Sequence, residues 1–163
     1  MTPQQQSDFI ESLVPGAQAA QAQFGVFASV SIAQAIFESS WGQSELAIKA
    51  NNYYGVKEYP GFAGSTITLP TKEDRPDGTS YMIEAAFCAY PDMASSIVGH
   101  GVFLSNNGKP ERYAAALQCA DGPSQAMEIA AAGYSTNPQY GEQLCQEIAA
   151  RNLQQYDAIP SSN

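Results

Sequence analysis

One segment of this sequence, residues 53–90, departs from the helical pattern of the rest, and this change constrains the fold most. Residues Ser65–Leu69 alternate polar and apolar side chains and are rich in β-branched residues, which is typical of a strand. Pro76-Asp77-Gly78 is a turn signature, and Tyr81–Tyr90 is expected to be the returning strand. We therefore expect one β-hairpin, with a long loop over Pro70–Thr79, inside a chain that is otherwise helical.

Apolar residues recur at helical spacing on both sides of the hairpin. The expected helices cover residues 7–14, 17–24, 26–38, 93–104, 110–119, 124–132 and 138–153. Pro15-Gly16 is expected to interrupt the first two, and residues 158–163 to form a loose tail. The fold class predicted is mainly α, of the α+β type, with a small β-hairpin lobe.

Length and charge exclude several classes of protein. A chain of 163 residues is expected to form one domain, residues 1–163. Seven Lys and Arg against sixteen Asp and Glu give a net charge of −9. This excess argues against nucleic acid or an anionic membrane as the main partner. No stretch approaches the roughly 18 apolar residues of a membrane span, and no basic, apolar leader is visible.

Cysteine and histidine are scarce, so we expect no structural metal site. The cysteines Cys88, Cys119 and Cys145 include no CxxC pair, and His100 is the single histidine. Pairing of Cys119 with Cys145 and three buried free thiols are both left open. His100 lies in an apolar helical segment, and we interpret it as structural.

Glu38 is the first candidate for chemistry. It lies at the C-terminal end of the most apolar helix, after Phe37, and we expect Trp41 on nearly the same face. A carboxyl group among aromatic side chains is desolvated, which raises its pKa. A general acid near neutral pH requires such a raised pKa. The alternative is an ordinary solvated glutamate at a helix end.

The segment 50–57 is the second candidate. It carries Asn52, Tyr53 and Tyr54 in a short non-helical stretch. Aromatic faces stack on sugar rings and amides bind their hydroxyl and acetamido groups, so this segment suits a sugar-binding wall. The alternative is an ordinary turn between helix and hairpin.

Two more regions carry candidate side chains. The hairpin loop holds Glu73, Asp74 and Asp77, and one of these could supply a second carboxylate across a cleft from Glu38. The alternative there is a solvated charged loop. The segment 132–140, which contains Tyr134 and Tyr140, is expected to join two helices. Both tyrosines could face a cleft, or one could pack in the core while the other caps the loop.

Together these segments resemble a known family. The stretch from Ala28 to Gly42, which contains Phe-Glu-Ser-Ser-Trp-Gly, and the stretch Asn-Tyr-Tyr-Gly-Val-Lys over residues 52–57 resemble the catalytic core of the family-73 glycoside hydrolases. Residues 87–90 resemble that family's aromatic-x-x-Tyr strand ending, and residues 132–140 resemble its "AGYATDPxY" segment. This family contains peptidoglycan β-N-acetylglucosaminidases, including the flagellar rod-associated muralytic enzyme and many autolysins. The resemblance runs from about Phe9 to about Leu153.

The resemblance implies a fold, an activity and site residues. The fold would be lysozyme-like, and the chain would be a bare catalytic domain acting on peptidoglycan glycan strands in the periplasm or the extracellular cell wall. No cofactor, metal, nucleic acid or membrane insertion is implied, and an inhibitor or immunity protein is left open. The implied catalytic residues are Glu38, Glu73 and Tyr134, with Asp74 as a fallback for Glu73. The implied substrate-binding residues are Trp41, Asn52, Tyr53, Tyr54 and Tyr140.

The sequence departs from the family pattern at two places. Ser40 replaces the glycine of the usual Glu-Ser-Gly-Trp-Gly, which should matter little if the backbone there is helical, and Cys88 replaces an arginine. Glu38 is expected to protonate the glycosidic oxygen between N-acetylglucosamine and N-acetylmuramic acid. A water activated by Glu73, or the substrate's own acetamido group, would then attack. A muramidase, a lytic transglycosylase and a non-catalytic glycan-binding module are the alternatives.

Overall fold

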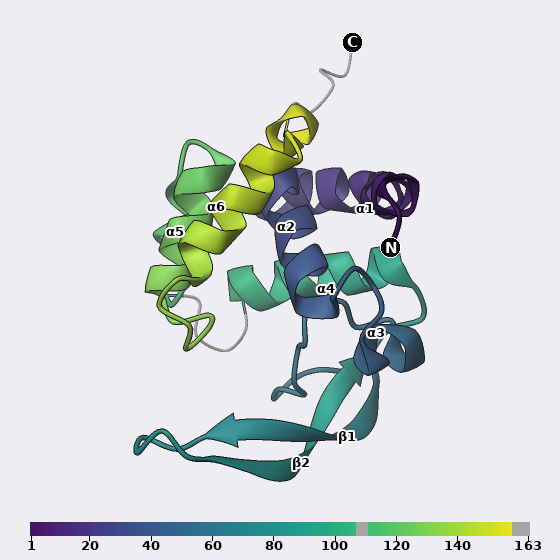
Figure 1. Ribbon diagram of the computed structural model, residues 1–163, viewed down its shortest axis with the longest axis vertical. Coiled ribbons are helices and arrows are strands. Elements are labelled where there is room, and N and C mark those ends of the chain that lie inside the picture. The colour runs from purple at the N-terminus through teal and green to yellow at the C-terminus, as the bar shows by residue number, and fades with distance from the viewer. Residues whose placement is uncertain (107–110, 158–163) are drawn as a thin grey trace.

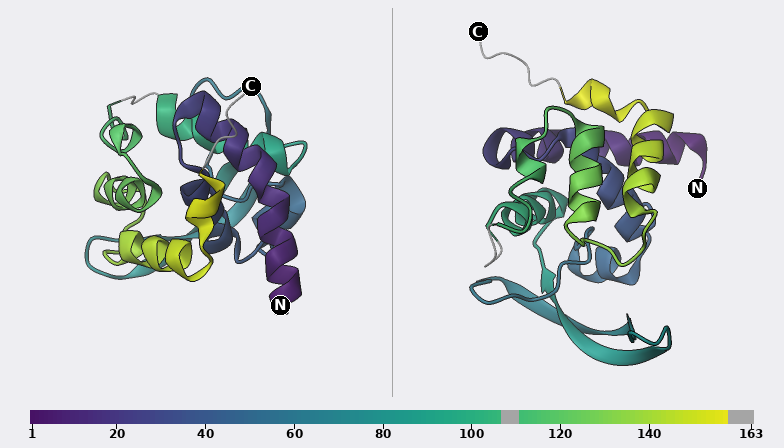
Figure 2. Two further views of the ribbon diagram at one scale, coloured as in Figure 1. Left: turned by 90° about the horizontal axis from the view of Figure 1, so that it is seen from above. Right: turned by 90° about the vertical axis from the view of Figure 1, so that its left-hand side faces the viewer.

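The computed structural model describes residues 1–106 and 111–157, leaving aside the side chains of Asp74 and Asn106. This part contains helices α1 (Pro3–Phe24), α2 (Ala28–Ser39), α3 (Glu45–Ala50), α4 (Met93–Asn106), α5 (Gly122–Ala131) and α6 (Tyr140–Ala150), strands β1 (Ser65–Asp74) and β2 (Ser80–Ala89), and 3₁₀ helices η1 (Ala116–Gln118) and η2 (Leu153–Tyr156). The helices form one body and the hairpin projects from one end of it (Figures 1 and 2). The predicted mainly helical fold with a small β-hairpin lobe is confirmed.

Helix α1 begins and ends with strong local signals. The Thr2 hydroxyl accepts from the Gln5 backbone N–H, and the Gln5 side chain accepts from the Thr2 N–H, which is a capping box. Gly25 ends the helix in the left-handed region, at φ 75°. The expected break at Pro15-Gly16 is wrong, because α1 continues through Pro15. A Cβ at Gly16 would come within 2.7 Å of Ile97 in α4, so this glycine serves close packing of two helices and not a turn.

Helix α2 lies at the centre of the body, and its buried N-terminus is satisfied by side chains from distant elements. The Asp157 carboxylate accepts from the Ser29 backbone N–H at 2.7 Å and from the Ser29 hydroxyl at 2.8 Å. The Gln21 side chain accepts from the Ala28 backbone N–H at 2.9 Å, and the Gln125 side chain accepts from the Phe27 backbone N–H at 2.8 Å. Donors at a helix start cost free energy if they are buried without partners. These contacts therefore allow the helix that ends in Glu38 to run through the core.

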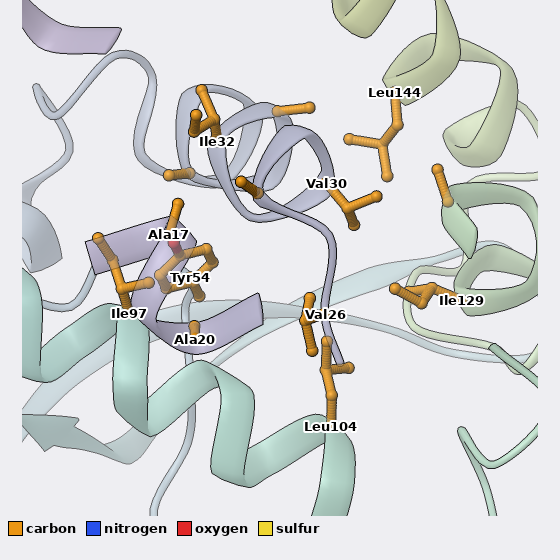
Figure 3. Close-up of a cluster of buried hydrophobic side chains, with 14 of the residues drawn as sticks. Ala17, Ala20, Val26, Val30, Ile32, Tyr54, Ile97, Leu104, Ile129 and Leu144 are labelled. Carbon is orange, nitrogen blue, oxygen red and sulfur yellow. The ribbon is translucent and has the colours of Figure 1, made fainter. Parts of the chain in front are cut away.

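The hydrophobic core surrounds α2 and is drawn in Figure 3. Ala17 and Ala20 of α1 lie near Ile97 of α4, Leu104 of α4 lies beside Val26, and the side chain of Val30 points toward α5 and α6 (Figure 3). All of these side chains are buried in one cluster. The small alanines on α1 let α1 and α4 approach closely. Helix α2 packs against α1 on one side and against α5 and α6 on the other.

The hairpin is longer than predicted. Strand β1 pairs antiparallel with β2 from Ser65 opposite Ala89 to Asp74 opposite Ser80. The first half of the expected loop, Pro70–Asp74, is therefore strand, and Pro70 lies within β1, opposite Glu84. Both strands of a two-stranded sheet are edge strands, where proline is tolerated.

Two further predictions are decided by the fold. Residues 111–118 form turns and the 3₁₀ helix η1 in place of the expected helix over 110–119, and residue 110 itself lies outside the described residues.

The three cysteines are free thiols in the described structure, with Cys88 buried and the other two half-buried. The predicted loose tail, residues 158–163, also falls outside the described residues. Within residues 1–106 and 111–157 no helix is long and apolar enough to cross a membrane.

Candidate active site

Helix α2 presents a polar face in an otherwise apolar helix. Ser31, Gln34 and Glu38 follow one another at spacings of three and four, so they share one side of the helix. Ser31 and Gln34 are fully buried, whereas Glu38 is half-buried at the helix end. The helix thus carries a carboxyl group from the core to the surface.

The end of α2 differs from the sequence-based expectation. Ser40 and Trp41 are both left-handed, with φ of 49° and 62°, so the backbone at Ser40 is not helical and the chain turns away from Glu38. The Trp41 ring lies 6.1 Å from the Phe9 ring and 5.1 Å from the Arg151 guanidinium. The expectation that Trp41 shares the face of Glu38 is therefore wrong, because the helix ends between them.

Glu38 is held by a chain of two hydrogen bonds. The Tyr140 hydroxyl donates to Glu38 Oε1 at 2.6 Å, and Gln34 Nε2 donates to the Tyr140 hydroxyl oxygen at 3.0 Å. Burial raises the pKa of Glu38, and the hydrogen bond from Tyr140 offsets part of this effect. The raised pKa that the sequence suggested is present, but tyrosines surround the carboxyl group and not Trp41.

Tyr134 lies behind Tyr140 on the loop between α5 and α6. The two rings stack with centroids 5.7 Å apart and planes 9° apart, and the Tyr134 hydroxyl donates to the Tyr54 carbonyl at 3.4 Å. Arg112, which the sequence gave no reason to select, donates to the Ala132 carbonyl at 3.1 Å and also to the Gly133 carbonyl. Arg112 therefore fixes the start of the loop that carries Tyr134 and leads to Tyr140, the first residue of α6.

Asn52 shapes its loop from within and does not face solvent. Its amide donates to the carbonyls of Val56 and Cys88 at 2.9 and 2.8 Å, and its oxygen accepts from the backbone of Tyr54 and Val56 at 3.3 and 3.1 Å. With only 1% of its surface exposed, Asn52 has no atom left to bind a sugar. The amide pattern of this segment reflects a turn, which was the alternative interpretation.

The neighbouring tyrosines separate into a core residue and a surface residue. Tyr54 is buried and stacks on His100, with centroids 3.9 Å apart and planes 7° apart. Burial lowers the pKa of His100 to about 3, so its ring is neutral at physiological pH. Tyr53 is half-buried and packs its ring 6.2 Å from Phe9. His100 lies in the core, consistent with its structural interpretation, and Tyr54 contacts the cleft only as part of its floor.

Glu73 contacts the site through a lysine. It lies in β1 opposite Tyr81, and its carboxylate forms an ion pair with Lys57 of the preceding loop. The backbone of Lys57 in turn forms a bridge with Phe87 of β2, which ties the loop to the hairpin. The side chain of Asp74, the fallback for Glu73, lies outside what the structure describes.

A cleft of about 370 Å³ brings several of these groups together. Its walls consist of one residue from α2, a continuous loop segment, one residue of α4 and residues before and after α5. They are Glu38, Tyr54, Gly55, Val56, Lys57, Glu58, Tyr59, Phe103, Arg112, Tyr113, Tyr134 and Ser135. The mixture of one protonatable carboxyl group, aromatic rings and charged side chains suits acid catalysis on a polar ligand with apolar faces.

Prediction and structure overlap in part at this cleft. Glu38, Tyr54 and Tyr134 line it, while five other predicted residues, among the described ones, do not: Trp41, Asn52, Tyr53, Glu73 and Tyr140. Tyr140 and Asn52 support lining residues from behind, and Glu73 reaches the cleft through Lys57.

The sequence analysis did not select four of the lining residues, which are Tyr59, Phe103, Arg112 and Tyr113. Only Tyr59 had a local signal, because it lies two residues after the motif that ends at Lys57. In the described chain no group of three or more His, Cys, Asp or Glu side chains could hold a metal ion.

The chain is similar to known proteins over most of its length. A family model described as "Mannosyl-glycoprotein endo-beta-N-acetylglucosaminidase" matches residues 14–153. Exo-glucosaminidase LytG of Bacillus subtilis is 32% identical over 97% of the chain, and peptidoglycan hydrolase FlgJ of Pseudomonas aeruginosa is 32% identical over 95%. The chain spans 56% and 38% of the lengths of these two relatives.

A solved structure extends the similarity to the fold. The catalytic domain of the autolysin Auto from Listeria monocytogenes has a TM-score of 0.85 at 30% identity, covering 96% of this chain and 90% of that one. The lysozyme-like architecture implied by the sequence resemblance is confirmed by this agreement.

Proposed function

Since the chain belongs to the glucosaminidase family, the family-73 glycoside hydrolases, we propose that it cleaves the β-1,4 bond between N-acetylglucosamine and N-acetylmuramic acid in peptidoglycan. The observation that supports this most is the environment of Glu38 in the cleft wall. Its pKa is raised by burial, and Tyr140 holds one of its two carboxyl oxygens. The names of the relatives LytG and FlgJ, a glucosaminidase and a peptidoglycan hydrolase, also support it.

In the proposed reaction Glu38 is the general acid. It gives its proton to the glycosidic oxygen as the bond to the sugar breaks and an oxocarbenium-like transition state develops. A raised pKa keeps the carboxyl group protonated closer to neutral pH, so activity should fall as pH rises through that pKa. Tyr134, which lines the cleft beside Glu38, is proposed to support the reacting sugar.

Two routes complete the reaction. In the first, Glu73 activates a water on the opposite face of the sugar, and the anomeric centre inverts. In the second, the acetamido oxygen of the substrate attacks and configuration is retained. Glu73 is already paired with Lys57, so the first route requires that this ion pair open when substrate binds.

The variant Glu73→Gln separates the two routes. Under the first it should lose about 10²- to 10⁴-fold in kcat, as expected for loss of a general base. Under the second it should retain most activity. NMR of the newly released reducing end, recorded before mutarotation, gives an independent answer.

The proposed substrate fixes a location and leaves alternatives to be tested. Peptidoglycan strands lie in the cell wall, so we propose action in the periplasm or outside the cell, by one catalytic domain. Trp41 and Tyr53 are proposed to lie along the outer part of the glycan groove. A muramidase, a lytic transglycosylase and a glycan-binding module are the competing functions.

Mass spectrometry of digested peptidoglycan tests the proposal. The wild type should release fragments with reducing N-acetylglucosamine ends, and Glu38→Gln should release none. Glu45→Gln, which removes an exposed carboxylate on α3, is the matched control and should behave as wild type. Reducing or anhydro muramic ends would indicate a muramidase or a transglycosylase, and binding without products would indicate a glycan-binding module.

A further inference from the structure

We propose that Gln34 and Tyr140 form a positioning pair that keeps the acidic proton of Glu38 on Oε2, the oxygen left available to the substrate. This inference rests on the proposed role of Glu38 as general acid. Neither of the two belongs to the described residues that line the cleft. Both would therefore act through Glu38 and not on the sugar.

The first step of the argument is the direction of the Tyr140 hydroxyl proton. Gln34 Nε2 is an N–H donor 3.0 Å from the Tyr140 oxygen, so that oxygen is used as an acceptor on this side. The hydroxyl proton must then point to its other neighbour, Glu38 Oε1, at 2.6 Å. The Gln34 amide thus determines that Tyr140 donates to Glu38.

The second step is the location of the proton on Glu38. An oxygen that accepts a hydrogen bond from Tyr140 is favoured as the carbonyl oxygen of the protonated acid. The acidic proton is therefore favoured on Oε2, which has no hydrogen-bond partner among the described side chains and backbone. Glu38 lines the cleft, so Oε2 is the atom from which a proton can be transferred to substrate.

The third step is rigidity. Tyr140 and Gln34 are essentially unexposed, at 1% and 0%. The Tyr140 ring stacks on Tyr134 with centroids 5.7 Å apart, and its centroid lies 5.5 Å from that of the nearly perpendicular ring of Phe37. A buried ring packed against two other rings is restricted in its rotation, so the orientation of Tyr140 toward Glu38 is set before substrate arrives.

Three variants test the pair. Tyr140→Phe removes the donor and keeps the ring, Gln34→Met removes the amide at similar length, and Ser31→Ala is the matched control. Ser31 is buried one turn earlier on the same helix face, and in the described structure its hydroxyl has no hydrogen-bond partner. We expect kcat to fall by about 10- to 100-fold in the first two, the loss caused by a misplaced catalytic group. KM should change little, and Ser31→Ala should match wild type.

The pH profile separates positioning from simple damage. The hydrogen bond from Tyr140 favours the carboxylate, so its removal should raise the pKa of Glu38 and move the alkaline limb of kcat to higher pH. The other titratable or charged groups that line the cleft with Glu38 are Tyr54, Lys57, Glu58, Tyr59, Arg112, Tyr113 and Tyr134. They are identical in all variants, so the difference reports on Tyr140 alone.

The double variant and a direct titration complete the test. If Gln34 acts only through Tyr140, then Gln34→Met with Tyr140→Phe should lose no more than Tyr140→Phe alone. Titration of the Glu38 carboxyl carbon by NMR reads the same pKa shift without activity, and thermal unfolding checks that each variant folds. Additive losses, or an unshifted Glu38, would overturn the pair. Activity retained in Glu38→Gln would instead refute the proposed function itself.

Discussion

The single histidine should make this fold sensitive to mild acid. His100 is fully buried between the ring of Tyr54, 3.9 Å away, and the edge-on ring of Tyr134, 6.0 Å away. Neither ring nitrogen has a hydrogen-bond partner among the described residues. Protonation would place an unpaired charge in the core, and burial accordingly lowers its pKa from 6.5 to about 3.

The magnitude follows from proton linkage. Above the unfolded-state pKa of 6.5 the ring is neutral in both states, so its contribution to stability is complete. As pH falls from 6.5 toward the folded-state value of about 3, the unfolded chain binds a proton that the native protein does not. Each pH unit in this window removes about 1.4 kcal/mol of unfolding free energy. At about pH 5 the loss is therefore about 2 kcal/mol, or roughly 1 M in urea midpoint for a slope of about 2 kcal/mol per M.

Urea unfolding at about pH 7.5 and pH 5 measures this loss, with His100→Phe as the comparison. Phenylalanine keeps a planar ring between the two tyrosines and does not titrate. Glu38 and Asp157 have raised pKa values and act in the opposite direction, but they are present in both proteins. The difference between wild type and variant should therefore change by about 2 kcal/mol between the two pH values. An equal pH response in both proteins would refute a neutral, unpaired His100 in the core, whatever the absolute stability of the variant.

Two further predictions concern the ends of α2 and α5. Ser40→Gly should raise the unfolding free energy by about 1 kcal/mol, because a left-handed φ of 49° is strained for serine and free for glycine; an unchanged urea midpoint would contradict this. Arg112→Ala should lower kcat by about tenfold with little change in melting temperature, because the loop of Tyr134 loses two backbone contacts. Arg112→Lys should not restore activity, since one ammonium cannot reproduce the planar fork that binds both carbonyls; full rescue by lysine would show that charge alone matters.

Local patterns predicted the elements well where one signal acted alone. Apart from the helix expected over 110–119, the periodic segments are helical, the alternating strand is present, and Gly25 ends α1 as expected. The errors occurred where tertiary packing reversed the usual meaning of a residue. Pro15-Gly16 normally marks a turn, yet here the glycine accommodates Ile97, and Pro70 continues an edge strand.

At the site, properties set by neighbouring residues could be predicted from the sequence, whereas contacts between residues distant in the sequence could not. The candidacy of Glu38 as an acid could be predicted because one continuous segment shows both its apolar helix and its position at the end of that helix. The sequence also named Tyr134 and Tyr140, but it could not divide their roles, because 102 residues separate Tyr140 from Glu38 and the stacking of the two rings depends on the whole body. Asn52 shows the converse error, since an amide suited to a sugar is equally suited to closing its own loop.

The same physical requirement explains why the residues that tune Glu38 resemble ordinary core. An acid that stays protonated near neutral pH has to be desolvated, and a desolvated carboxyl group is stabilised only if a partner shares its burial. The partner must then be buried as well, and it needs a second partner for its own polar atoms. Gln34 behind Tyr140 meets this requirement, with a hydrogen bond at each step from the helix interior to the cleft. Such residues do not line the cleft, so they can be distinguished from other buried polar residues only by the partner that each one holds.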